Sequence, residues 1–191
     1  MTRPRGDTDE TPARQRITDA FFELLSEGGY SGVTVRSLAA CANVSPNTIY
    51  YHFESIFDAA RYAVESELSI ELALFLVSPE GQDEGSLTRL LDDPANQRRF
   101  GRIRLVAASG NAQLTSILTE AVEEEWLQAA GIDKDCLTPD QAQDLRFIFR
   151  GAMDLLSSVE TAEDIRALPN FFSRPLGNGI RETLQELVSQ K

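Results

Sequence analysis

A run of twenty residues in the first third of the chain constrains the fold most strongly. Residues 34–53 read Thr-Val-Arg-Ser-Leu-Ala-Ala-Cys-Ala-Asn-Val-Ser-Pro-Asn-Thr-Ile-Tyr-Tyr-His-Phe. Thr34 can cap a first helix, residues 43–44 turn the chain, and Ser45-Pro46 caps and opens a second helix. The segment therefore predicts two short helices joined by a tight turn.

The second of these helices carries polar groups on its outer surface. A helical hairpin that served only for packing would not need polar groups there. Hydroxyl groups, imidazole and the backbone N–H groups at a helix start can bind DNA phosphates, while asparagine, arginine and tyrosine can contact base edges. Helix pairs of this kind lay their second helix in the major groove. We therefore predict phosphate contacts from Thr34, Ser45, Thr48, Tyr50 and His52. Base contacts are predicted for Asn47, Tyr51 and Arg36.

Helical periodicity continues on both sides of this pair. Thr11 and Pro12 predict the start of an earlier helix, which the glycine pair at 28–29 ends. A fourth helix is predicted from Ser55 to about Val77. At about 1.5 Å per residue it would span on the order of 30 Å, long enough to leave one helical bundle and join another. The inward residues of the first bundle are predicted to be Phe21, Leu38, Ile49 and Phe53.

The rest of the chain also has helical periodicity and no strand pattern, so the sequence predicts an all-α protein. Helices are predicted over residues 86–91, 97–108, 113–130, 139–159 and 162–168, and after Gly179. The apolar stripes of residues 145–159 and 180–188 could pack within one chain. We expect them instead to meet their copies in a four-helix dimer interface.

The inventory of reactive side chains argues against an enzyme. The 191 residues are 42% apolar and 25% charged, which is ordinary for a soluble globular protein. Cys41 and Cys136 are too far apart in sequence to indicate a disulfide framework or a metal site, and His52 is the single histidine. There is no signal-peptide pattern and no apolar run long enough to span a membrane. We therefore expect a cytoplasmic protein without catalytic activity, metal or cofactor.

The charge is distributed unevenly along the chain. Its formal net charge is −12, which argues against non-specific affinity for a polyanion. Residues 1–55 carry five basic and seven acidic side chains, whereas residues 56–191 carry 13 basic and 23 acidic ones. The predicted DNA-binding segment is therefore nearly neutral, and the acidity lies in the rest of the chain. The near-neutral charge of this segment is compatible with DNA binding but is not evidence for it.

Several residue types at fixed spacing resemble the N-terminal domain of the TetR family of bacterial repressors. They are Arg16-x-x-x-Ala20 through Leu25, Gly28-Gly29-Tyr30, Thr34-Val35, Leu38-Ala39 and Val44-Ser45-x-x-Thr48-Ile49-Tyr50-x-His52-Phe53. The resemblance covers about residues 12–60 and extends to the remainder in architecture only. It implies a helix-turn-helix DNA-binding domain over residues 11–55 and a helical ligand-binding and dimerisation domain over 56–191. The polar residues 1–10, with Pro4 and Gly6, are predicted to form a flexible arm.

Two positions depart from the family pattern. Many members have a lysine just after the His-Phe pair, where it meets a phosphate, but here the stretch reads Glu54-Ser55-Ile56-Phe57. The usual small residue before the family's threonine is Asn47, which adds a side chain near the bases. The first departure weakens phosphate binding, and the second could sharpen the choice of sequence. Arg3 and Arg5 could compensate by reaching the minor groove.

The resemblance implies a ligand pocket in the second domain, but the sequence distinguishes its lining residues poorly from core residues. Our candidates are Arg104, Trp126, Phe149 and Met153. The alternative is that the three apolar residues belong to the core, which is the commoner place for such residues at helical spacing.

Together these observations predict a ligand-responsive transcriptional regulator. We expect a homodimeric repressor that binds an inverted-repeat operator in double-stranded DNA and is released by a small-molecule effector of unknown identity. The alternative is the same fold used as a protein-interaction scaffold with weak or no DNA binding, which the acidic balance and the missing lysine favour.

Overall fold

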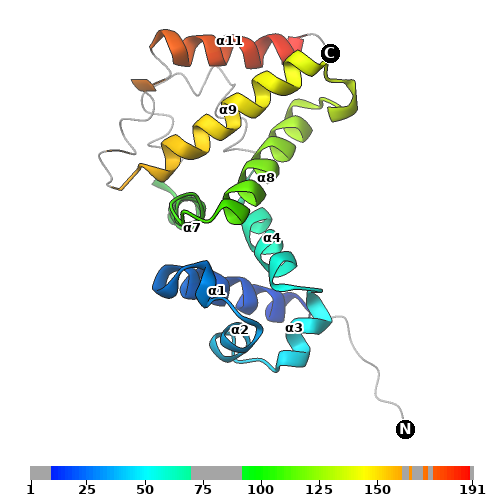
Figure 1. The fold of residues 1–191 in the computed structure, drawn as a ribbon, viewed down its shortest axis with the longest axis vertical. Coiled ribbons are helices and arrows are strands. Elements are labelled where there is room, and N and C mark those ends of the chain that lie inside the picture. Colours follow the sequence, from blue (N-terminus) through cyan, green and yellow to red (C-terminus); the bar gives the residue numbers. More distant parts are fainter. Residues whose placement is uncertain (1–9, 70–91, 161–163, 165–169, 172–173, 190–191) are drawn as a thin grey trace. The chain divides into compact units, whose positions relative to one another are not determined.

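The computed structural model describes residues 10–69, 92–160, 164, 170–171 and 174–189. Throughout these residues the regular structure is helical and contains no strand, so the predicted all-α fold class is confirmed (Figure 1). The contacts divide the chain into two compact units, the first ending at Ser66 and the second beginning at Glu67.

The first unit contains α1 (Glu10–Gly28), the 3-10 turn η1 (Tyr30–Gly32), α2 (Val35–Cys41), α3 (Pro46–His52) and most of α4 (Ile56–Glu67). The helix predicted to start after Thr11 begins at Glu10 instead. Proline is tolerated there because the N–H groups of a first helical turn have no partner within the helix. Chain reversal after α1 uses Gly29, whose φ of 66° lies in the left-handed region.

The first unit closes around one apolar core. The four residues predicted to face inward, Phe21, Leu38, Ile49 and Phe53, are all buried. Phe21 also meets Phe22 edge-on, with ring centroids 5.2 Å apart. Because α3 contributes Ile49 from its middle and is followed directly by Phe53, the middle and the C-terminal end of this short helix are fixed to the core.

The predicted length of the fourth helix is wrong. α4 has 12 residues and ends at Glu67, and Leu68 and Ser69 are not helical. At about 1.5 Å per residue it spans about 18 Å. The apolar pattern runs past Glu67 without glycine or proline, so no stop signal for the helix is present there. Glu67, the last residue of the helix, forms an ion pair with Arg102 on α7. Residues 70–77 lie outside the described residues.

The second unit contains α7 (Pro94–Ala107), α8 (Ala112–Ala130), the 3-10 turn η3 (Lys134–Cys136), α9 (Pro139–Ser157) and α11 (Pro175–Ser189). α7 starts three residues before the predicted Gln97, capped by Asp93, and α11 starts at Pro175 instead of after Gly179. A proline at the first position of a helix is favourable enough to outweigh nearby glycines. The helices predicted over 86–91 and 162–168 lie outside the described residues, apart from Asp164.

The two apolar stripes of the second unit pack against each other within one chain. α9 contributes Leu145, Ile148 and Phe149, and α11 contributes Leu184 and Leu187, to one cluster with α8. α9 and α11 lie side by side (Figure 1). The stripes therefore pack within one chain, the alternative that the sequence left open, and a dimer interface on the same two helices stays a prediction.

Candidate nucleic-acid interface

The turn between α2 and α3 fixes the direction of α3 through backbone hydrogen bonds. The Val44 N–H donates to the Ala39 carbonyl at 2.9 Å, and the Asn43 N–H donates to the Ala40 carbonyl at 3.2 Å. This is the Schellman arrangement of a helix end. It requires a left-handed residue, and Asn43 has a φ of 52°, which asparagine adopts more readily than most residues.

Hydroxyl groups cap both helices as the sequence predicts. At α2 the Ser37 N–H donates to the Thr34 hydroxyl at 3.1 Å, and the Thr34 N–H donates to the Ser37 hydroxyl at 2.9 Å. At α3 the Thr48 N–H donates to the Ser45 hydroxyl at 3.1 Å, and the two hydroxyls lie 2.9 Å apart. A hydroxyl can accept two hydrogen bonds and donate one, so these caps keep capacity for a further partner.

The outer face of α3 presents two aromatic rings to solvent. Tyr50 is 62% exposed and Tyr51 is 67% exposed, although Ile49 beside them is buried. The ring of Tyr51 meets that of His52 edge-on, with centroids 5.0 Å apart. Large exposed rings are common at surfaces that bind a partner, because one end is apolar and the other carries a hydrogen-bonding group.

The structure brings the predicted DNA contacts together on α2, α3 and their caps. Thr34, Arg36, Ser45 and Asn47 are exposed, and Thr48 and His52 are half-buried. Together with the two tyrosines they form what we call the α2–α3 polar surface: Thr34, Arg36, Ser45, Asn47, Thr48, Tyr50, Tyr51 and His52. The contact of each residue with DNA stays a prediction.

Sequence reasoning missed two residues that support α3 from behind. The ring of Tyr62 on α4 lies 5.4 Å from the ring of Phe53, and the guanidinium of Arg14 on α1 lies 5.4 Å from the centre of the Tyr62 ring. Arg14 thereby joins α1, α4 and the end of α3. Helical periodicity carries no signal for such a contact, because cation–π pairs link residues that are distant in sequence.

The predicted pocket residues lie in and beside the core of the second unit. Trp126 and Phe149 are fully buried with ring centroids 5.9 Å apart, and Met153 is buried as well. Arg104 is half-buried and donates from Nη1 to the Val159 carbonyl at 2.9 Å. Among the described residues the indole Nε1 of Trp126 has no hydrogen-bond partner. Whether these residues contact a ligand stays a prediction.

Other kinds of site find little support in the described part of the chain. No group of three or more His, Cys, Asp or Glu side chains there could hold a metal ion. None of the described helices is both long and apolar enough to cross a membrane. Both cysteines are free, and burial raises the pKa of the Cys41 thiol, with further increases from a hydrogen bond and the charge of Glu23 and from the charge of Glu27.

Comparison with known proteins matches the region that holds the α2–α3 polar surface. Residues 17–58 fit the family described as bacterial regulatory proteins, tetR family. Over 48 residues the chain is 35% identical to the HTH-type transcriptional regulator UidR of Escherichia coli (strain K12) and to UidR of Shigella flexneri. The match spans 25% of this chain and 24% of each relative, about a quarter of their length.

Solved structures resemble the chain over a greater length but at low similarity. A TetR-family transcriptional regulator from Streptomyces coelicolor covers 93% of this chain and 98% of its own, with 19% identity and a TM-score of 0.39. The multidrug binding protein EbrR, complexed with imidazole, covers 97% of both chains, with 23% identity and a TM-score of 0.44.

Proposed function

We propose that this chain, whose residues 17–58 match the tetR family of bacterial regulatory proteins, is a transcriptional regulator and acts as a ligand-responsive, homodimeric repressor of an inverted-repeat operator. One observation carries the proposal. Tyr50 and Tyr51 are exposed on a seven-residue helix that Ile49 and Phe53 fix to the core and whose start carries hydroxyl and amide groups.

This arrangement suits the major groove because rigid side chains lose little entropy on binding. The Tyr51 ring can contact a thymine methyl group, and the Asn47 amide can pair with adenine in a bidentate contact worth about 1–3 kcal/mol of discrimination. The Tyr50 hydroxyl can donate to a phosphate, which fixes position without reading sequence. In a dimer the two α3 helices would enter successive major grooves, about 34–36 Å apart.

The test is selection of bound duplexes from a random-sequence pool by the purified chain at moderate salt. We expect an enriched inverted repeat. Tyr51→Ala should then weaken binding of that repeat by about 10–100-fold, the equivalent of 1–3 kcal/mol. Tyr51→Phe keeps the ring and should bind like the parent, whereas Tyr50→Phe should weaken all sequences alike. No enrichment, with Tyr51→Ala behaving like the parent, would favour the interaction scaffold instead.

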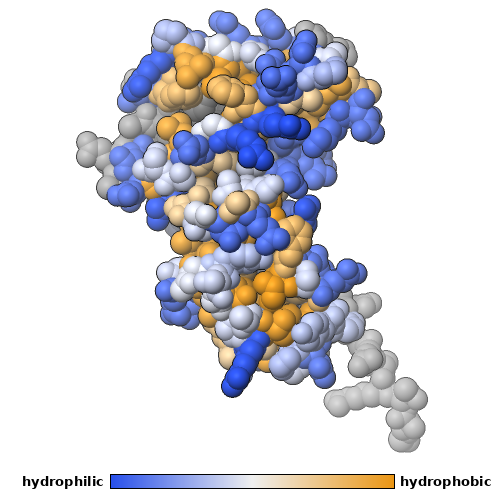
Figure 2. Space-filling model, viewed as in Figure 1, coloured by the Kyte–Doolittle hydropathy of each residue, from blue (hydrophilic) through white to orange (hydrophobic). Residues whose placement is uncertain are grey.

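The second unit offers a surface suited to a homodimer. Phe147 on α9 is 70% exposed and Leu176 on α11 is 60% exposed, and apolar side chains gather on the surface over these two helices (Figure 2). A groove between the helices is lined by Asp144, Phe147, Ile148, Pro175, Leu176, Gly179, Ile180 and Thr183. Two helices from each copy would form the four-helix interface expected of a symmetric dimer.

A sedimentation experiment separates this interface from its alternatives. We expect the parent chain to sediment as a dimer and a Phe147→Asp, Leu176→Asp double variant to sediment as a folded monomer. Glu182→Lys changes charge at an exposed position on α11 outside the groove lining and should stay dimeric. A monomeric parent, or a dimeric double variant, would contradict an interface at this surface.

The effector is proposed to act through the second unit. A ligand shifts the protein between two states only by its different affinity for each of them. Since Trp126, Phe149 and Met153 are buried, a ligand that contacts them must separate α8 from α9. Screening compounds for release of the selected operator identifies such a ligand, and Met153→Ala should change its affinity without changing that of the operator.

A further inference from the structure

A row of aromatic rings runs from the outer face of α3 to a cation on α1, entirely within the first unit. The ring centroids of Tyr51 and His52 are 5.0 Å apart, and those of His52 and Phe53 are 6.3 Å apart. The centroid of Tyr62 on α4 lies 5.4 Å from that of Phe53. Beyond Tyr62 the row ends at Arg14, whose guanidinium carbon lies 5.4 Å from the centre of the Tyr62 ring. The row therefore connects the α2–α3 polar surface to a positive charge on another helix.

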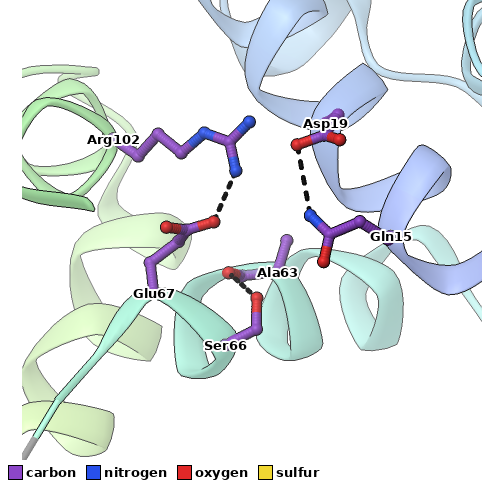
Figure 3. A network of polar contacts seen from close by, with 6 residues as sticks. All are labelled: Gln15, Asp19, Ala63, Ser66, Glu67 and Arg102. Carbon is purple, nitrogen blue, oxygen red and sulfur yellow. Dashed lines mark hydrogen bonds and ion pairs between the residues drawn. The ribbon is translucent and has the colours of Figure 1, made fainter. Parts of the chain in front are cut away.

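The guanidinium of Arg14 has no anionic partner in the described part of the chain. Its Nε is buried without a hydrogen-bond partner, and among the described residues no ion pair with the Arg14 side chain is present. On the same helix the carboxylate of Asp19 accepts a hydrogen bond from the Gln15 Nε2 at 3.3 Å, so this acidic side chain has another partner (Figure 3). Because Arg14 is half-buried, it has lost part of its hydration. The face of the Tyr62 ring attracts the cation but accepts hydrogen bonds only weakly.

A phosphate is the anion that suits this group. A guanidinium presents five N–H donors in a fixed, planar fork, which matches the oxygens of a phosphate. The contact with Tyr62 restricts where the guanidinium of Arg14 lies, so less side-chain entropy is lost when it binds. The same row contains His52, a predicted phosphate contact. Since phosphates follow one another along each DNA strand, a cation farther along the row suits a further phosphate of the strand that His52 contacts.

We propose that Arg14 binds a backbone phosphate of the operator and that Tyr62 is the positioning residue for its guanidinium, an inference that rests on the proposed repressor. The contact fixes the position of the first unit on the duplex and reads no sequence. It adds a full positive charge to an interface whose predicted phosphate contacts are hydroxyl and imidazole groups. The salt dependence of DNA binding should therefore come from Arg14 more than from any of those groups.

The experiment measures the affinity of the purified chain for the selected operator and for an unrelated duplex over a range of salt concentrations. The logarithm of the affinity falls with the logarithm of the salt concentration, with a slope of about 0.9 for each neutralised phosphate. Arg14→Gln should therefore reduce this slope by about 0.9 for each bound subunit. At moderate salt it should weaken the binding of both duplexes alike, by about ten-fold.

Two arginine variants serve as controls. Arg14→Lys keeps the positive charge without the planar fork, so it should keep the slope and lose part of the affinity. Arg16→Gln removes the same charge from an exposed position of the same helix. Because α1 has about 3.6 residues per turn, Arg16 lies on roughly the opposite side of it from Arg14, and the slope and the affinity should stay unchanged. Far-UV circular dichroism and thermal melting establish that each variant is folded.

Variants of Tyr62 test its positioning role. Tyr62→Phe keeps the ring and should bind both duplexes like the parent. Tyr62→Leu leaves the charge of Arg14 in place but removes the ring, so the affinity should fall by less than in Arg14→Gln, at an unchanged slope. In the Arg14→Gln background, Tyr62→Leu should have no further effect on affinity. A further loss of affinity in that background would show that Tyr62 does not act through Arg14.

The outcomes distinguish this inference from the proposed function. If the parent chain binds no enriched repeat, the proposed function fails and this inference fails with it. If the parent binds the enriched repeat and folded Arg14→Gln keeps both its slope and its affinity, the phosphate contact alone is wrong. A loss of affinity at an unchanged slope in Arg14→Gln would likewise overturn it, because that pattern indicates a purely structural role for Arg14.

Discussion

The two units use their aromatic side chains in opposite ways. In the first unit Tyr50 and Tyr51 point outward from a seven-residue helix, which hydrogen bonds between near neighbours in sequence hold in place. In the second unit Trp126 and Phe149 lie inside, held by packing among helices from distant parts of the chain. The first unit therefore has a surface specified by local chemistry, whereas the second has an interior specified by long-range contacts.

This difference predicts that the two units respond differently to the same kind of substitution. The largest effect is expected from loss of a buried ring: Phe149→Ala in the second unit should cost about 3–5 kcal/mol of unfolding free energy. Phe21→Ala should cost a similar amount in the first unit. Urea unfolding followed by circular dichroism should give two transitions, each variant shifting one of them. A single transition shifted equally by both would mean that the units unfold as one.

The turn residue Asn43 should matter next. Its φ of 52° is unfavourable for a β-branched residue, so Asn43→Val should destabilise the first unit by about 1–2 kcal/mol. Asn43→Gly adopts the same backbone without a steric penalty and serves as the control. Thermal melting and operator affinity should both fall for the valine variant and stay near the parent for glycine. A valine variant as stable as the parent would show that the turn can adopt another conformation.

The helix caps test the same contrast at a smaller scale. Ser45→Ala at α3 and Thr138→Ala at α9 each remove a hydroxyl cap and should each cost about 1 kcal/mol. Only Ser45→Ala should also weaken operator binding, because its hydroxyl is a predicted phosphate contact. The affinities are compared under conditions in which the same fraction of each variant is folded. Equal operator affinity of the two variants would show that Ser45 does not contact the operator.

The smallest effect concerns reactivity, since each unit contains one cysteine. Burial raises the pKa of Cys41, and Glu23 and Glu27 raise it further, so less thiolate is present at neutral pH. We expect iodoacetamide to label exposed Cys136 several-fold faster than half-buried Cys41. The Cys41 rate should rise as the pH approaches its higher pKa. Mass spectrometry with Cys41→Ser and Cys136→Ser as controls measures each rate, and faster labelling of Cys41 would contradict this.

Local signals were predictable from the sequence, and tertiary choices were not. Thr34 and Ser45 were identified as caps because a cap involves residues three positions apart. The end of α4 was missed because the apolar pattern continues past Glu67 without glycine or proline. The start of α11 was missed because Gly179 resembles a helix boundary, although Pro175 already provides a favourable start.

The candidate sites divide in the same manner. The α2–α3 polar surface could be predicted because DNA contact requires polar side chains at spacings set by one short helix. Arg14 and Tyr62, which support that helix, could not, because their contact joins α1 to α4. Phe147 and Phe149 illustrate the limit in the second unit: both fit a helical pattern, yet one is exposed and the other buried.

The placement of aromatic residues also gives each unit its own optical label. All four tyrosines, Tyr30, Tyr50, Tyr51 and Tyr62, precede the boundary at Ser66, and the single tryptophan, Trp126, follows it. Light absorbed only by indole therefore excites the second unit alone, from a ring shielded from water. Tyrosine absorbance reports the first unit. Unfolding of the first unit and events in the second can thus be followed separately in the unmodified chain, without attached dyes.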